Sequence, residues 1–144
     1  MSYIKNNYKY KTEERVKIML DIQQELKKYK ILDSEGNPIY DLYQMQEIQK
    51  GLEKNLDVSK YAILNSGGKP VFGYYQMWEI REGLEAGVDV SQYTILNSKG
   101  EPVYDAYQMA QIQIGLETGV DVSRFTTLNQ EGEPVYDSNQ MYAI

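Results

Sequence analysis

The sequence contains no cysteine and no histidine among its 144 residues. The lack of cysteine excludes disulfides, thiolate metal sites and thiol nucleophiles. The lack of histidine removes the commonest general base and the commonest metal ligand of proteins. The sequence also has no run of about 18 apolar residues, the length that a membrane span needs. Its N-terminal stretch, MSYIKNNYKYKTEERVK, has no apolar segment of the kind found in secretory signals. Together these absences predict a cytoplasmic protein.

Proline is also scarce, and its four copies mark a repeat. They stand 32 residues apart, at Pro38, Pro70, Pro102 and Pro134. Three units with the pattern ILNSKGEPVYDAYQMAQIQIGLETGVDVSRFT and a fragment follow one another, at 31–62, 63–94, 95–126 and 127–144. A fixed period of this length is typical of stacked supersecondary units. We therefore expect an N-terminal region over residues 1–30 and a repeat domain over residues 31–144.

Charge is distributed unevenly between these two regions. Residues 1–30 carry a net charge of +4 and residues 31–144 a net charge of −10, which together give the overall −6. An acidic repeat domain disfavours nucleic acid as a ligand, because phosphates require a positive surface. It suits solubility or the binding of a basic protein partner.

Each unit opens with a turn between two short apolar segments. The turns begin with Asp or Asn and have glycine at the fourth position, as in Asp33-Ser-Glu-Gly36. This pattern is typical of a type I turn closed by a left-handed glycine, which often connects two strands. We therefore predict a short β-hairpin in each unit, with the proline at a strand position whose N–H need not pair.

A helix is expected after each hairpin. In three units an aspartate is followed three residues later by glutamine, the spacing of a capping box; the aspartates are Asp41, Asp105 and Asp137. The second unit has Gly73 at this position. Methionine, isoleucine and leucine then recur at i, i+3 and i+7, which predicts one buried helix face.

The end of each helix is also marked by its residues. Gly87, Gly119 and Asn55 are suited to the left-handed conformation that often ends a helix. A glycine also recurs inside each helix, at Gly51, Gly83 and Gly115, and predicts the close approach of a neighbouring element. A short helical turn follows and brings an aromatic residue to the core, at Tyr61, Tyr93 and Phe125. The predicted fold class is α+β, a small solenoid of hairpin, helix and short helical turn, and the alternative is an all-α repeat array.

The N-terminal region is predicted to contain a helix over residues 13–29 that caps the array. Thr12 is a candidate N-cap, and apolar residues then recur with helical spacing. Tyr29 holds the register of the aromatic residue that ends each unit. Residues 1–11 show no clear period and are predicted to form a polar arm.

The repeat resembles one found in uncharacterised proteins of Firmicutes, many of them carried by phages, plasmids and other mobile elements. The resemblance lies in the segments GLEAGVDVSQYT (83–94) and GLETGVDVSRFT (115–126) and in the QMxxI pattern before them. It covers residues 31–144 and implies no chemistry, although the hairpin between aromatic residue and helix departs from the family pattern. What it implies is a role in a mobile element, such as a phage protein that acts against host defence.

No group of residues indicates catalysis, a cofactor or a metal. Glu79, Glu82 and Glu85 share one helix flank, but only the last position is acidic in every full unit, as expected for a solvated face. The loop that starts at Asp33 lacks the bidentate glutamate of a calcium site. No serine stands beside a candidate base. We therefore predict a protein that is not an enzyme.

Residues at positions that vary between units are the candidates for binding. The single tryptophan, Trp78, holds a register occupied by Gln46, Ala110 and Tyr142 elsewhere. It is either a filler between units or an exposed anchor, since interfaces favour tryptophan, tyrosine and arginine. The candidate partner-binding residues are Trp78, Tyr74, Arg81, Glu79, Glu82 and Glu85.

The predicted function is a protein-binding repeat scaffold. The most specific hypothesis is an inhibitor from a phage or mobile element that binds a basic host protein, such as a CRISPR nuclease, through its acidic surface. One alternative is a cell-wall or glycan-binding module. Another is nucleic-acid binding through the basic N-terminal region, with the candidates Lys5, Lys9, Lys11, Arg15, Lys17, Tyr8 and Tyr10. The incomplete fourth unit also allows a homo-oligomer, in which a second molecule completes the array.

Overall fold

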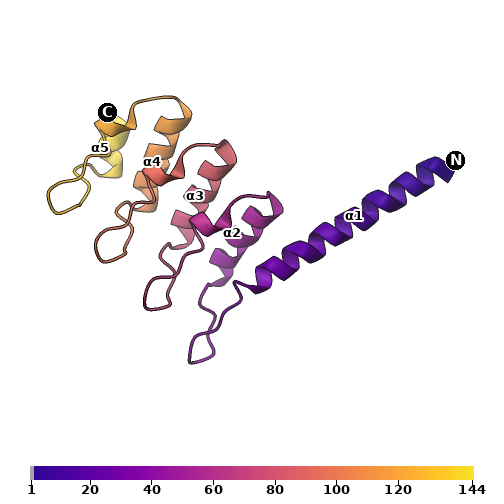
Figure 1. The fold of residues 1–144 in the computed structure, drawn as a ribbon. Coiled ribbons are helices and arrows are strands. Elements are labelled where there is room, and N and C mark those ends of the chain that lie inside the picture. The colour runs from indigo at the N-terminus through magenta and orange to yellow at the C-terminus, as the bar shows by residue number, and fades with distance from the viewer. Residues whose placement is uncertain (1) are drawn as a thin grey trace.

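The computed structural model describes the backbone of residues 2–144 and the side chains of residues 11–144. The chain forms a row of similar units joined to a long N-terminal helix (Figure 1). The α-helices are α1 (Ser2–Lys27), α2 (Leu42–Glu53), α3 (Tyr74–Ala86), α4 (Ala106–Glu117) and α5 (Ser138–Ala143), and the 3-10 helices are η1 (Val58–Lys60), η2 (Val90–Gln92) and η3 (Val122–Arg124). None of the described helices is both long and apolar enough to cross a membrane.

The predicted β-hairpins are wrong, and with them the α+β fold class. Residues 2–144 contain no β-strand, and the all-α alternative fits the structure. Each loop makes a single antiparallel bridge, between the pairs Leu32–Pro38, Leu64–Pro70, Leu96–Pro102 and Leu128–Pro134. Backbone hydrogen bonds flank the first bridge on both sides, from Asp33 N–H to the Asn37 carbonyl at 2.8 Å and from Ile39 N–H to the Ile31 carbonyl at 2.9 Å. The pairing ends there, because the N-cap of the next helix follows at Asp41. The loops project from one edge of the row and do not pair into a sheet (Figure 1).

The predicted helix ends are confirmed. The carboxylate of Asp41 accepts a hydrogen bond from the Gln44 backbone N–H at 2.7 Å, and the Gln44 side chain accepts one from the Asp41 N–H at 2.9 Å. The same reciprocal pairs start α4 and α5. At the other ends Asn55, Gly87 and Gly119 have φ values of 56°, 74° and 77°, the left-handed conformation that the sequence predicted.

The same capping glutamines also join consecutive units. The side-chain amide of Gln44 donates to the carbonyl of Phe72 in the next unit at 3.0 Å. Gln76 donates to the carbonyl of Tyr104 at 3.0 Å, and Gln108 donates to that of Tyr136 at 2.9 Å. We call this series the glutamine ladder. It runs in one direction, because each unit donates to the unit that follows it.

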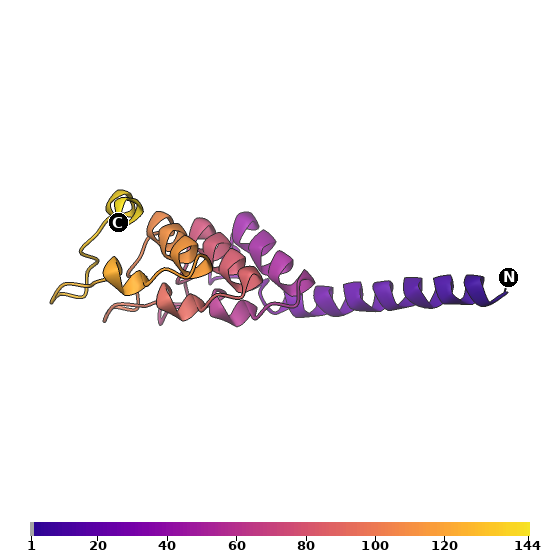
Figure 2. The same ribbon diagram turned by 90° about the horizontal axis from the view of Figure 1, so that it is seen from above.

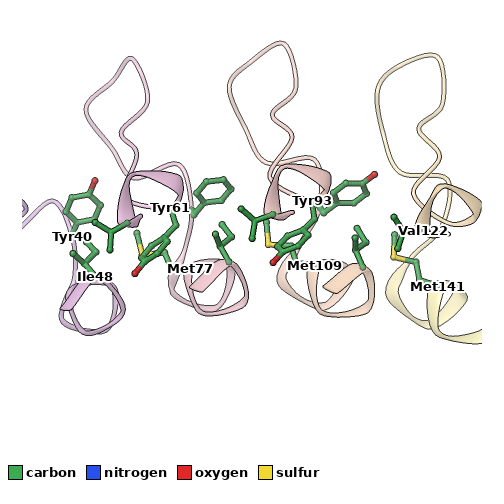
Figure 3. Close-up of a cluster of buried hydrophobic side chains, with 14 of the residues drawn as sticks. Tyr40, Ile48, Tyr61, Met77, Tyr93, Met109, Val122 and Met141 are labelled. Carbon is green, nitrogen blue, oxygen red and sulfur yellow. The ribbon is translucent and has the colours of Figure 1, made fainter. Parts of the chain in front are cut away.

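The 3-10 helices return the chain to the next unit, and the aromatic residue after each one enters the core. Tyr61 and Tyr93 have no exposed surface, and the row of buried side chains that contains them runs through all the units (Figure 3). Each ring lies directly on the glycine inside its helix. A Cβ built on Gly83 would stand 1.8 Å from the Tyr93 hydroxyl oxygen, so only glycine permits this contact.

The N-terminal region differs from its prediction at the start of the helix. Residues 2–11 are helical and continue directly into the predicted helix, because no proline or glycine interrupts them. Among the side chains that the structure describes, those that pack on the repeats from this region lie at the C-terminal end of α1 and just after it, at buried Leu26 and half-buried Tyr29. The remainder projects away from the row as an isolated rod (Figure 2).

Substitution of Gly83 by alanine tests the contact between ring and helix. We expect Gly83→Ala to destabilise the protein by about 1–3 kcal/mol, because the added methyl group overpacks the core against Tyr93. The double variant Gly83→Ala/Tyr93→Phe should recover part of this loss, since it removes the hydroxyl that the new Cβ meets. Chemical denaturation measures both. A Gly83→Ala variant as stable as the parent protein would contradict the assignment.

Candidate functional site

Exposed aromatic side chains gather at the N-terminal ends of α2 and α3. Tyr74 lies at the centre, with ring centroids 5.4 Å from Tyr43, 5.0 Å from Tyr75 and 6.0 Å from Trp78. The exposed fractions of Tyr43, Tyr75 and Trp78 are 58%, 66% and 38%. We call these four residues the aromatic patch. Trp78 is therefore exposed and contacts Tyr74, and its side chain is not enclosed between units.

A groove with acidic walls lies between α3 and α4. Its volume is about 560 Å³, and none of its lining residues is Lys or Arg. Four carboxylates line it: Glu79, Glu82, Glu85 and Glu117. We call it the acidic groove. It brings together the three glutamates that the sequence placed on one flank and adds Glu117, which the sequence did not single out.

The aromatic patch and the acidic groove are connected. The indole Nε1–H of Trp78 donates to the Glu82 carboxylate at 2.6 Å. The two residues are one helical turn apart on α3, so this bond holds the indole against the rim of the groove. A ligand can therefore contact an aromatic face and several carboxylates at the same time.

Glu79 is the most perturbed of these carboxyls. Burial between α3 and α4, with a smaller contribution from the charge of Glu82, raises the pKa of Glu79 to about 7. In the amide orientation that matches donors with acceptors, Gln113 Nε2 donates to Glu79 Oε2 at 3.2 Å and to the Glu79 carbonyl at 2.9 Å. This carboxyl changes its charge near neutral pH, in contact with a groove open to solvent.

The equivalent positions between α2 and α3 hold a buried ion pair. Glu47 and Arg81 are 1% and 7% exposed, and the guanidinium Nε–H donates to the Glu47 carboxylate. Arg81 also contacts Glu85 at 3.0 Å, and Lys54 binds the same carboxylate. The hydrogen bond from Lys54 is the main cause of the lowered pKa of Glu85. Arg81 therefore joins two units and does not share the exposed surface of Trp78.

The acidic groove exists because the cations of the preceding junction are replaced. The registers of Lys50, Lys54 and Arg81 hold Glu82, Ala86 and Gln113 in the following unit. Glu79 holds the register of Glu47, and Gln113 holds that of Arg81. A neutral amide therefore faces Glu79 where a cation faces Glu47. The expectation of a solvated helix face is wrong for this register, since Glu47 is buried and Glu79 is half-buried.

The residues proposed for nucleic-acid binding lie in α1. Lys11, Arg15 and Lys17 are exposed on the projecting helix. The side chains of the other candidates lie outside the described residues: Lys5, Lys9, Tyr8 and Tyr10. In the part of the chain whose side chains are described, no group of three or more acidic residues is placed to bind a metal ion.

Sequence reasoning did not select two members of the aromatic patch. Tyr43 and Tyr75 recur at one register, like the core residues, and recurrence by itself points to the scaffold. The signal that distinguishes them is their place in the first turn after the N-cap, two residues before the buried methionine register. Side chains there point away from the face that Met77 buries.

Comparison with known proteins found no matching family, no matching curated protein and no matching solved structure. Function is therefore inferred from the site itself, since a fold alone does not determine function. What the site offers chemically is aromatic surface beside the carboxylates of Glu82 and Glu117, which form no ion pair with a described residue, an arrangement suited to cationic side chains.

Breaking the buried ion pair should cost considerable stability. We expect Arg81→Met to destabilise the protein by about 3 kcal/mol, because Glu47 would stay buried with only Lys50 near it. The double variant Glu47→Gln/Arg81→Gln should be close to the parent protein, because it leaves no charge buried without its partner. Glutamine already stands at both registers in the third unit, at Gln111 and Gln113. Urea denaturation measures both. A double variant as unstable as Arg81→Met would contradict the pairing.

The raised pKa of Glu79 predicts a pH-dependent effect on stability. A carboxyl whose folded-state pKa exceeds its unfolded value disfavours folding progressively as the pH rises from about 4.5 to 7. The stability of Glu79→Gln relative to the parent protein should therefore be greater at pH 8 than at pH 5. Thermal unfolding at the two pH values measures the difference, and Glu131→Gln, in an exposed loop, is the control. An effect of Glu79→Gln that is equal at both pH values would contradict the raised pKa of Glu79.

Proposed function

We propose that this chain is a non-enzymatic scaffold that binds a basic protein through the aromatic patch and the acidic groove. The observation that carries the proposal is the hydrogen bond between Trp78 and Glu82, which makes the aromatic surface and the carboxylates one continuous site. Buried aromatic anchors beside charged residues are typical of the residues that dominate binding energy in protein interfaces.

Arginine is the side chain that best fits this site. Its planar guanidinium forms paired hydrogen bonds with carboxylates and stacks on aromatic faces. In the acidic groove the carboxylates of Glu82 and Glu117 are available for such bonds, while Glu85 is already bound by Lys54 and Arg81. Trp78 offers the stronger of the aromatic faces for a cation.

The charge of the repeat domain supports a partner that itself binds nucleic acid. Residues 31–144 carry a net charge of −10, and a surface that binds phosphates is positive. The acidic repeat domain would attract such a surface over long range and cover it, so that nucleic acid is excluded. We therefore propose an inhibitor of a nucleic-acid-handling host protein, acting in the cytoplasm of the cell that a phage or mobile element occupies.

Trp78 is the only tryptophan and reports directly on binding. Titration with an oligo-arginine peptide should change its fluorescence, with an affinity that falls as salt is added. Glu82→Gln should weaken binding by about tenfold, the equivalent of 1.4 kcal/mol, because it removes one charge-assisted contact. Glu131→Gln removes the same charge from an exposed loop and should change the affinity little. Equal affinities of the two variants would refute the site.

The physiological partner can then be sought with the same variants. Affinity capture from a host lysate should retain a basic protein on the parent chain and lose it on Trp78→Ala. The purified partner should bind DNA or RNA, and the parent chain should displace that nucleic acid. A captured partner that binds nucleic acid and this chain simultaneously would refute the inhibitory role.

A further inference from the structure

The N-terminal end of the row carries a groove that none of the described residues fills. It lies between the C-terminal end of α1 and α2, has a volume of about 530 Å³ and is largely apolar. Its lining includes Leu26, Tyr29, Tyr40, Leu42, Met45 and Gln49. Met45 is only half-buried, whereas the methionines at the same register in later units are buried, at Met77, Met109 and Met141. The later repeat helices each pack on a repeat helix before them, whereas α2 is preceded by α1, which contacts it and then projects away from the row (Figure 2). We call this the N-terminal groove.

The helix that would fill this groove within the chain is directed elsewhere. By the repeat register, residues 10–21 correspond to α2, and Gln23 corresponds to the left-handed Asn55. Gln23 stays helical, so α1 continues straight instead of turning back (Figures 1 and 2). Met19 stands at the register of Gly51, where any Cβ would overlap the ring of the aromatic residue. Residues 10–21 therefore cannot occupy the groove as an additional repeat helix.

The glutamine ladder is open at this end and at the opposite end. The carbonyl of Tyr40 corresponds to the carbonyls that Gln44, Gln76 and Gln108 reach in later units, and no described residue donates to it in this way. Gln140 is the matching donor in the fourth unit. Its Oε1 accepts from Asp137 N–H at 2.9 Å, as in the other caps, and its amide nitrogen has no acceptor among the described residues.

Apolar surface is likewise exposed at both ends. Ile144 holds the register of Ile48, Ile80 and Ile112, which are fully buried, yet it is 55% exposed. At the other end, the side chains of Val16, Met19 and Leu20 on α1 are 49–64% exposed. Their helical spacing places them on the face that continues to Gln23 and Leu26 in the N-terminal groove.

We propose that the N-terminal groove binds α5 of a second copy of this chain, so that copies stack head to tail. The docked copy reproduces the contact that already joins α2 to α3, α3 to α4 and α4 to α5. Gln140 of one copy donates to the Tyr40 carbonyl of the next, and Ile144 enters the apolar groove beside Met45. This heterologous contact generates open rows, or a ring where the rotation closes.

The charges at the new junction are compatible with burial. Two equivalent pairs of residues face each other across the existing junctions: Glu47 faces Arg81 between α2 and α3, and Glu79 faces Gln113 between α3 and α4. In the proposed junction the same two registers hold Ala143 and Gln49. The junction therefore buries no carboxylate at this position, so it requires no cation to compensate it.

The experiment uses the full chain and two variants that block opposite ends. Met45→Lys places a charge in the N-terminal groove, where Met45 is half-buried. Ile144→Lys places a charge directly after α5, where Ile144 is exposed. In sedimentation velocity the mass of the parent protein should rise with concentration, and each variant alone should stay monomeric. An equimolar mixture of the variants should form a one-to-one dimer, because each variant retains the end that the other lacks.

Three outcomes would overturn the proposal: a parent protein that stays monomeric throughout, a variant that associates as the parent does, or a mixture that forms no dimer. Tyr107→Lys, on an exposed residue away from both ends, is the matched control and should associate like the parent protein. Circular dichroism checks that each variant is folded. Binding of oligo-arginine in the acidic groove should be unchanged in both blocking variants, so the two proposals can fail independently.

Discussion

The contact between an aromatic ring and a helix glycine is the constraint on which the row of units depends. The rings of Tyr61 and Tyr93 lie where a Cβ on Gly51 or Gly83 would stand. This contact fixes the path by which the chain returns from the end of one helix to the start of the next. Because the return path is the same in every unit, consecutive helices arrive in the same relation, and one glutamine can both cap its helix and join the next unit.

The same constraint explains why α1 projects. It carries Met19 and Gln23 at the registers that need a small residue and a left-handed residue. It therefore supplies Leu26 to the core, with Tyr29 just after it, but cannot return as a repeat helix, and the N-terminal groove beside α2 stays open. Two of the registers that shape a repeat helix therefore hold unsuitable residues in α1, which projects as a rod and leaves the N-terminal groove unfilled by the described residues.

Functional character arises where units differ at equivalent positions. Glu47 faces Arg81 across one junction, and the next junction pairs Glu79 with Gln113. The first arrangement is a neutralised link between helices, whereas in the second no cation faces Glu79. Trp78 stands beside this surface, at a register that holds alanine in the following unit. The scaffold thus supplies geometry, and residue differences at equivalent positions decide which junction holds a buried ion pair and which has an acidic groove.

The sequence by itself determined the period, the capping boxes, the left-handed helix ends and the close approach at the helix glycines, because each depends on the backbone geometry of a few neighbouring residues. It also identified Trp78 and the glutamate flank by their variation between units. It did not determine whether the loops pair as strands, since that depends on the path of the chain after the single bridge at Pro38, where the N-cap of the next helix already follows at Asp41. Only the tertiary structure decided that Arg81 is buried, that Glu79 titrates near neutral pH and that α1 leaves a groove open. These properties depend on which side chain a neighbouring unit places opposite, at contacts some 30 residues apart in the chain.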